Sequence, residues 1–406
     1  MAVDFQLIDR VGTTTPLAAR PGATIAQVLM ENFIPPLSVT VTGSGDVPLP
    51  DGEHVQDGQS YRARLIEGYD LGAIRRLYTE YPGGGGHAYL KRRLVFTDDG
   101  NLTLEQAPFT MPDLARHVED TVRQTIERFR LVKPGEPMVL GLSGGVDSGS
   151  LMLALGALME SGLPIDLIAA TFEDFDSTYS DTFDRAHELA ERFGVRHELI
   201  PADLVRSIFH LDRPLRDVLP ALMETEDSHQ TMYVDHHTTR RTLEVFAAEQ
   251  GARTIALGLH TTDLLAGLVN AQATGYRLGG IPQRAVGDFS YVFPLAFIPK
   301  KELDLYYLHA TGGIPPQSPP NPWEFNPLDR NFHYYFADFM QSFWPGVEHW
   351  MFTGAALAAG GEEAKKSFVT CGNCKGSLDP QGRDWTPGAF CDVCSILARY
   401  DYVEGL

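Results

Sequence analysis

The sequence predicts an α/β fold built on a doubly wound parallel sheet. From about residue 136 to 312, apolar strand-like segments alternate with helix-like segments, which is the pattern of strands joined by crossover helices. A glycine-containing turn at residues 143–148 lies directly between the first of these strands and the helix that follows. Ligands of such sheets bind at the carboxyl ends of the strands, so this turn is also the first candidate for a site.

The turn follows the apolar run 138–142 and precedes a helix-like run at 149–155. Its residues are Ser143, Gly144, Gly145, Val146, Asp147 and Ser148. A helix N-terminus offers unpaired backbone N–H groups and the positive end of the helix dipole, which together bind phosphate. The glycines allow a close backbone approach, and the serine hydroxyls add donors. A carboxylate beside phosphates suits Mg²⁺, so the turn predicts a phosphate and magnesium site.

Further strands are expected at residues 167–172, 197–200 and 254–258, with helices at 181–193 and 240–250. The ends of these strands bring Thr171, Phe172 and Gly258 to the same edge of the sheet as the turn. Helices within residues 326–357 are expected to close this domain, which we place at 136–360.

Residues 1–70 are expected to form a small separate unit of strands and one helix in a ββαββ-like order. This order resembles the β-grasp, ubiquitin-like carriers of the ThiS and MoaD kind. Those carriers end in a free Gly-Gly, whereas here residues 66–70 read Ile-Glu-Gly-Tyr-Asp and more chain follows. The carrier chemistry therefore does not transfer, and a docking or structural module is expected.

Residues 71–135 are expected to connect the two units. They contain the glycine run 83–86, which is either a ligand lid or a tolerant turn, and a periodic helix at 112–130.

The chain of 406 residues has 33 basic and 53 acidic residues and a net charge of −20. This balance argues against a large nucleic-acid footprint, although residues 75–76 and 91–93 are local basic patches. No stretch has the length and apolarity of a membrane span, and no signal-peptide pattern is seen. We therefore expect a cytoplasmic enzyme.

All four cysteines lie in the last 36 residues, Cys371, Cys374, Cys391 and Cys394. Two CxxC knuckles separated by sixteen residues are typical of a structural zinc site. A pair of disulfides is disfavoured in the cytosol, and an iron–sulfur cluster is the remaining alternative. We expect Zn²⁺ in a zinc-ribbon-like tail over residues 365–406.

The SGGVDS run resembles the signature of the N-type ATP pyrophosphatases, the PP-loop family, and differs from the Walker loop GxxxxGK[ST]. The resemblance implies that ATP is cleaved between its α- and β-phosphates, so that the substrate becomes adenylated and pyrophosphate leaves.

Later segments resemble those of the tRNA 2-thiolation enzymes. The matching segments are 257–265, Arg284 with 293–295 and 300–303, 329–331 with 343–346, and the paired knuckles. Two departures matter. No cysteine lies outside 371–394, which excludes a cysteine-held cluster or persulfide in the catalytic domain, and Thr262 stands where the family has the first of two acidic residues. With the acidic net charge, these departures weaken tRNA as the expected substrate.

The resemblance implies a role for each candidate residue. Asp147 and Asp263 would hold Mg²⁺, and Lys300 or Lys301 would neutralise charge at the α- and β-phosphates. Thr171 and Phe172 would offer backbone groups to adenine. For the lysines the alternative is a solvated helix face, and for Asp263 it is a helix cap.

Three histidines are further candidates. His260, at a strand end, is the best placed for the pocket. His236 and His237 point to different sides of a helix, so at most one is expected to enter the site, as a base or a metal ligand.

Three functions follow from this sequence. The first is an adenylating transferase that delivers sulfur, from a donor protein or as sulfide, to tRNA or a small molecule. The second replaces sulfur by ammonia or an amine. The third is a non-catalytic nucleotide sensor. The resemblance also implies a homodimer.

Overall fold

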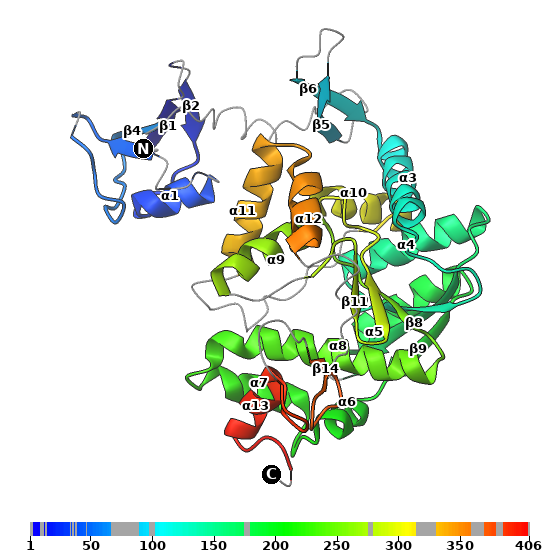
Figure 1. Ribbon diagram of the computed structural model, residues 1–406. Helices are drawn as coiled ribbons and strands as arrows, with labels where there is room; N and C mark the ends of the chain where they lie inside the picture. The colour runs from blue at the N-terminus through cyan, green and yellow to red at the C-terminus, as the bar shows by residue number, and fades with distance from the viewer. Residues whose placement is uncertain are drawn as a thin grey trace. The chain divides into compact units, whose positions relative to one another are not determined.

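The computed structural model describes residues 3–8, 12, 14–32, 34, 36, 39–45, 47–65, 89–96, 102–173, 179–274, 279–313, 330–358, 369–378 and 385–404. It divides the chain into two compact units, Met1–Gly85 and Gly86–Leu406 (Figure 1).

The first unit contains β1 (Asp4–Ile8), β2 (Thr14–Leu17), α1 (Ile25–Glu31), β3 (Val39–Thr42) and β4 (Ser60–Leu65). The sheet order is β2-β1-β4-β3, with a parallel central pair and antiparallel outer pairs. A capping box from Thr24 starts α1, and Ile25, Val28 and Leu29 of that helix are buried. The element order matches the predicted ββαββ order. The β-grasp assignment stays a prediction, and residues 66–70 lie outside the described residues.

The second unit is built on a six-stranded sheet. Its strands are β7 (Pro137–Gly141), β8 (Asp166–Phe172), β9 (Arg196–Ile200), β10 (Thr254–Ala256), β11 (Gln283–Val286) and β12 (Phe289–Val292). The order is β11-β12-β10-β7-β8-β9, and every pair is parallel except β11 with β12. The predicted doubly wound α/β fold is confirmed. The antiparallel edge pair was not predicted, because two four-residue strands on either side of a glycine turn give little periodicity.

Helices cover both faces of this sheet. One face carries α3 (Met111–Phe129), α4 (Val146–Glu160), α5 (Tyr179–Arg192) and α10 (Lys300–Thr311). The other face carries α8 (Thr231–Glu249), α9 (Thr261–Thr274), α11 (Arg330–Phe343) and α12 (Val347–Ala358). In β7, Met138 and Leu140 face the first layer while Val139 faces the second. This alternation is the expected consequence of strand geometry.

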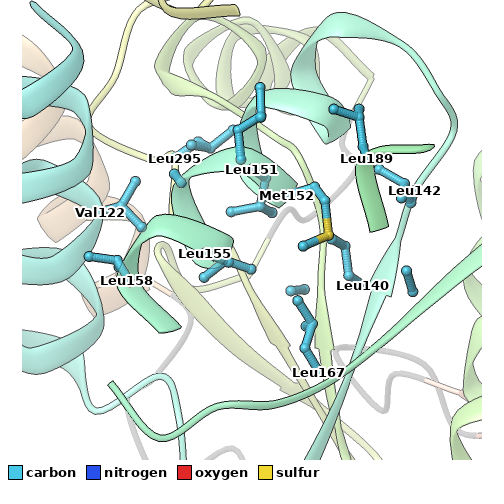
Figure 2. Packing of buried hydrophobic residues seen from close by; sticks show 14 of the residues in the cluster. Val122, Leu140, Leu142, Leu151, Met152, Leu155, Leu158, Leu167, Leu189 and Leu295 are labelled. Atoms are coloured by element: carbon cyan, nitrogen blue, oxygen red, sulfur yellow. The ribbon is translucent and has the colours of Figure 1, made fainter. Parts of the chain in front are cut away.

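The helix α4 is buried around almost its whole circumference. Leu151, Met152, Leu155 and Leu158 pack among residues of α3, β7 and β8, as Figure 2 shows. Burial on this scale anchors the helix firmly, because truncating one such leucine typically costs about 2–5 kcal/mol. The loop that precedes α4 is therefore fixed at one end by a rigid helix and at the other by a central strand.

The hairpin of β5 (Tyr89–Phe96) and β6 (Leu102–Phe109) precedes α3. Lys91 of β5 makes an ion pair of 2.8 Å with Glu302 of α10, and His117 of α3 lies 3.4 Å from the same buried carboxylate. Burial alone would raise the pKa of Glu302, but Lys91 and His117 hold it below its ordinary value. Since α3 also packs into the core of the sheet, the part of the predicted connector 71–135 that forms β5, β6 and α3 contributes structure to this unit. The predicted glycine run 83–86 lies outside the described residues.

The C-terminal segment shares a third core with α6 (Ala202–Phe209) and α7 (Leu215–Met223). It consists of β13 (Val369–Thr370), β14 (Ser377–Leu378) and α13 (Asp392–Arg399). The Asp212 N–H donates to the Tyr402 carbonyl at 3.1 Å, and Leu211 forms a bridge with Val403. The tail is thus packed into the second unit. The domain limits 1–70, 136–360 and 365–406 remain proposals.

Within the described ranges, no helix has the length and apolar character needed to cross a membrane.

Candidate functional site

The loop between β7 and α4 presents open backbone donors. Gly144 has a φ of 74°, a left-handed conformation that favours glycine. Gly145 is the N-cap of α4 and supplies no side-chain cap, so the first N–H groups of the helix remain available to an anion. The Ser143 N–H donates to Ser148 Oγ at 3.1 Å, and the two hydroxyls lie 3.0 Å apart. These contacts join the two ends of the loop.

The loop lies where the strand order reverses. The strands β7 and β10 are neighbours, but their connections leave toward opposite edges of the sheet. A crevice outside the carboxyl ends of two such strands is the usual ligand position in open α/β sheets. Gly258, just after β10, packs directly on α4, since a Cβ there would lie 2.7 Å from Ser148 N. The structure therefore brings the two predicted segments together.

Asp147, His260 and Asp263 form one group, with candidate ligand atoms all within 4.8 Å of one another. His260 Nδ1 accepts from the Asp263 N–H at 3.3 Å, so in the neutral ring the proton is on Nε2, 3.3 Å from Asp263 Oδ2. Carboxylate oxygens are the ligands that Mg²⁺ prefers. The donor set fits such an ion with Asp147 and Asp263 as ligands and His260 as the residue that orients Asp263.

Lys300 contacts Asp147 directly from the first residue of α10. Its Nζ also lies 3.1 Å from Asp304 Oδ1. Burial alone would lower the pKa of Lys300, but the two carboxylates raise it above its ordinary value, so the ammonium is charged at neutral pH. Burial lowers the pKa of Lys301. Of the two candidate lysines, Lys300 is the one seen against the loop's carboxylate.

Thr262 ties α9 to α10 and α11. Its hydroxyl donates to Asp338 Oδ1 at 3.3 Å and accepts from the Lys300 N–H at 3.4 Å and from Gln341 Nε2 at 3.3 Å. On the same side, Tyr334 contacts Asp263 Oδ1. Thr262, which stands where the thiolation enzymes have an acidic residue, thus joins three helices through its hydroxyl.

Asp338 of α11 was missed by the sequence analysis. Burial raises the pKa of Asp338 to about 6, against the opposing effects of Thr262 and His260. Tyr334, Asp338 and Gln341 recur at helical spacing in an otherwise aromatic stretch, and this polar stripe is the signal that could have identified the face that meets α9.

The Thr171 hydroxyl is fully engaged at the end of β8. It donates to the Leu142 carbonyl and accepts from His197 Nε2 at 2.7 Å. Burial, and then neighbouring His187, lower the pKa of His197 to about 4, so the ring is neutral at neutral pH. Only backbone groups of Thr171 remain for a ligand. Phe172 is partly buried and packs on both the sheet core and the core of the C-terminal tail.

The four cysteine sulfurs form a second, separate cluster. All four are buried and lie within 4.8 Å of one another, with Cys374 Sγ 4.0 Å from Cys391 Sγ. The N–H groups of Cys391 and Cys394 donate to sulfurs at 3.2 and 3.3 Å, as expected around thiolates. A single metal ion fits this donor set.

His237 belongs to the cysteine cluster. Its Nδ1 accepts from Arg240 at 3.2 Å, and its Nε2–H therefore donates to Cys391 Sγ at 3.5 Å. Burial, and then Arg240, lower the pKa of His237 to about 3. His236 is exposed. The sequence left open whether His236 or His237 enters the site. His237, the buried one of the two, contacts the cysteine cluster.

Comparisons with known proteins agree with this geometry. A family described as asparagine synthase matches residues 117–211. A tRNA-cytidine(32) 2-sulfurtransferase from Methylibium petroleiphilum is 28% identical over 207 residues, and one from Neisseria gonorrhoeae is 27% identical over 198 residues. The matches cover 50% and 48% of this chain, but only 61% and 57% of those relatives.

Among solved structures, the U34-tRNA thiolase NcsA from Methanococcus maripaludis with its [4Fe-4S] cluster has a TM-score of 0.55 at 18% identity. The match covers 74% of this chain and 91% of that chain. At this sequence identity the similarity supports the fold alone.

The sheet order, the loop at its reversal point and these matches define an α/β nucleotide-binding domain of the PP-loop, ATP pyrophosphatase kind. Within that class, the chain is similar to the tRNA thiolation enzymes.

Proposed function

We propose that this protein is an ATP-dependent tRNA thiolation enzyme. The observation that carries the proposal is the SGGVDS loop at the reversal point of the sheet, with Asp147 held by Lys300 and facing His260 and Asp263. The substrate class comes from the sulfurtransferase relatives, which act on tRNA cytidine by name.

In the first half-reaction, a carbonyl oxygen of the acceptor attacks the α-phosphorus of ATP. The bond from that phosphorus to the bridging oxygen breaks, and pyrophosphate leaves. The N–H groups at the start of α4 stabilise the departing phosphates, and the Lys300 ammonium offsets the charge that develops on them. Mg²⁺ bound by Asp147 and Asp263 would add further charge neutralisation. Backbone groups at Thr171 and Phe172 hold adenine.

In the second half-reaction, a sulfur nucleophile attacks the activated carbon. The carbon–oxygen bond to AMP breaks, and the base keeps the sulfur. The donor is sulfide or a partner protein that carries sulfur, since the four cysteines of this chain all lie in the tail. We place this activity in the cytoplasm and expect a homodimer.

We further propose that the four cysteines hold Zn²⁺ and that the catalytic domain works without an iron–sulfur cluster. Thiolates around one zinc ion stand about 3.8 Å apart when each Zn–S bond is ~2.3 Å. The 4.0 Å separation of Cys374 and Cys391 supports a single ion, because a four-iron cluster between the sulfurs requires a wider spacing. Metal analysis and electron paramagnetic resonance on anaerobically purified protein test this, and an iron signal would overturn it.

The deciding experiment measures pyrophosphate release from Mg-ATP with bulk tRNA and, separately, with pooled small metabolites, each with sulfide. We expect release that depends on tRNA, and a nucleoside digest with oxygen replaced by sulfur. Release that depends only on metabolites would contradict tRNA as the acceptor. A product carrying nitrogen in place of oxygen would contradict sulfur transfer, and cleavage of ATP to ADP and phosphate would contradict adenylation.

A further inference from the structure

The helix α5 forms one wall of the phosphate loop. A Cβ at Gly144 would lie 2.1 Å from the carbonyl oxygen of Thr182 in the first turns of α5. Glycine is therefore favoured at this position for a second reason besides its positive φ. Any side chain here would push α5 away from the loop. Groups on the next turn of α5 are thus held against the loop by backbone contact.

Arg185 is the residue on that next turn. Its Nε donates to the Gly144 carbonyl at 3.2 Å. A guanidinium has five N–H donors in a fixed, planar fork. The bond from Nε therefore orients the planar group and leaves the N–H groups of the two terminal nitrogens available to a ligand. Across the described parts of the chain, no carboxylate lies within ion-pair distance of Arg185.

The charge around the loop makes this arginine significant. Lys300 is shared between Asp147 and Asp304, so this group of three side chains is net negative. By itself, a group with this net charge repels a polyphosphate on balance. Arg185 is half-buried, and through its bond to the Gly144 carbonyl it brings to the loop a cation that is not neutralised in this way.

We propose that Arg185 binds the pyrophosphate portion of the nucleotide, with its terminal N–H groups on the β- and γ-phosphate oxygens. The inference deepens the proposed function and rests on the ATP-cleaving site described above. Planar, bidentate recognition of phosphate is the chemistry to which arginine is best suited.

The test measures binding of inorganic pyrophosphate with Mg²⁺, and of adenosine, to the full chain by calorimetry. R185Q keeps an amide donor that can reach toward the Gly144 carbonyl but removes the charge, and R185K keeps the charge. R192Q is the matched control, since Arg192 lies on the same helix and donates to the Ala310 carbonyl at 2.9 Å. We expect R185Q to weaken pyrophosphate binding by about 10- to 100-fold, the usual range for a hydrogen bond to a charged group.

We expect R185K to bind pyrophosphate more tightly than R185Q, R192Q to match the parent, and adenosine binding to be unchanged throughout. Parent-like pyrophosphate binding by R185Q would overturn the proposal. An equal loss of adenosine binding in R185Q would also overturn the proposal, because that pattern indicates a deformed loop. A parent protein that binds no pyrophosphate would overturn it as well. Since no tRNA is used, a failure of tRNA thiolation leaves this result intact.

Discussion

At the scale of single residues, the site is a small set of mutually oriented charges. Asp147 is held by Lys300, Asp263 is oriented by His260 and Tyr334, and Thr262 anchors the first N–H of α10. These side chains come from the first turns of α4, α9 and α10, from the residue that precedes α9, and from α11, and each contact restrains the loop further. The chemistry therefore depends on individual contacts that can be removed one at a time.

Replacing Lys300 separates the two candidate lysines. K300Q should lower the rate of tRNA-dependent pyrophosphate release by about 100- to 1,000-fold, because a preorganised charge at the departing phosphates is lost. K301Q, one residue further along α10, should retain most of the activity. The reverse ranking of the two variants in the release assay would assign the role to Lys301.

Asp338 should make stability depend on pH. Its folded pKa is about 6, above the unfolded value of about 3.9. The folded state binds this proton more tightly, so the stabilising contribution is complete below about pH 4 and is lost as pH rises through 6. At pH 8 the free energy of unfolding of D338N should therefore exceed that of the parent by about 3 kcal/mol, which denaturant titration measures as a higher midpoint. D120N, at an exposed site on α3, is the control. Parallel pH profiles for parent and D338N would contradict this.

At the scale of elements, the site depends on close packing of strand ends against α4. Gly258 and Gly144 permit two backbone approaches that no side chain would allow. The buried leucines of α4 keep the helix from moving away when these contacts are strained. At these two glycines, therefore, there is no room for even a methyl group.

Gly258→Ala tests that packing. The added Cβ would lie 2.7 Å from Ser148 N and 2.8 Å from Ser148 Cα, and overpacking of this kind costs about 1–3 kcal/mol. We expect lower thermal stability and ATP binding weakened by at least about tenfold. Gly354→Ala in α12 is the matched control, since nothing lies within 4 Å of its added Cβ. An unchanged ATP affinity in Gly258→Ala would show that the contact can relax.

At the scale of the whole second unit, much of the architecture follows from local sequence. The alternation of strands and helices predicts the doubly wound sheet. The SGGVDS and CxxC runs indicate candidate sites because each run is a short, recognisable motif. Asp338, Arg185 and His237 could not be placed in this way. Each reaches its partner only through tertiary packing, across 76, 41 and 154 residues of chain respectively.

Disrupting the proposed zinc site at the cysteine cluster should loosen one region of this unit and leave the sheet intact. The cysteines share a core with α6 and α7, and structural metal binding contributes directly to folding. In C394S we expect faster amide hydrogen exchange in α6, α7 and α13, with protection retained in β7 and α4. S395A, at the exposed neighbouring position, is the control. Uniform loss of protection across the sheet would contradict this independence.

The packing of the tail against α6 and α7 has a consequence for synthesis. A ribosome makes residues 371–403 well after it has made α6 and α7, yet the apolar faces of these helices are covered by that later segment. Phe172, whose backbone we propose to hold adenine, packs on the same core, so the surroundings of this residue are also complete only once the tail has been made. A nascent chain should therefore expose this surface to chaperones, and the proposed adenine site should be complete only after the last knuckle has emerged.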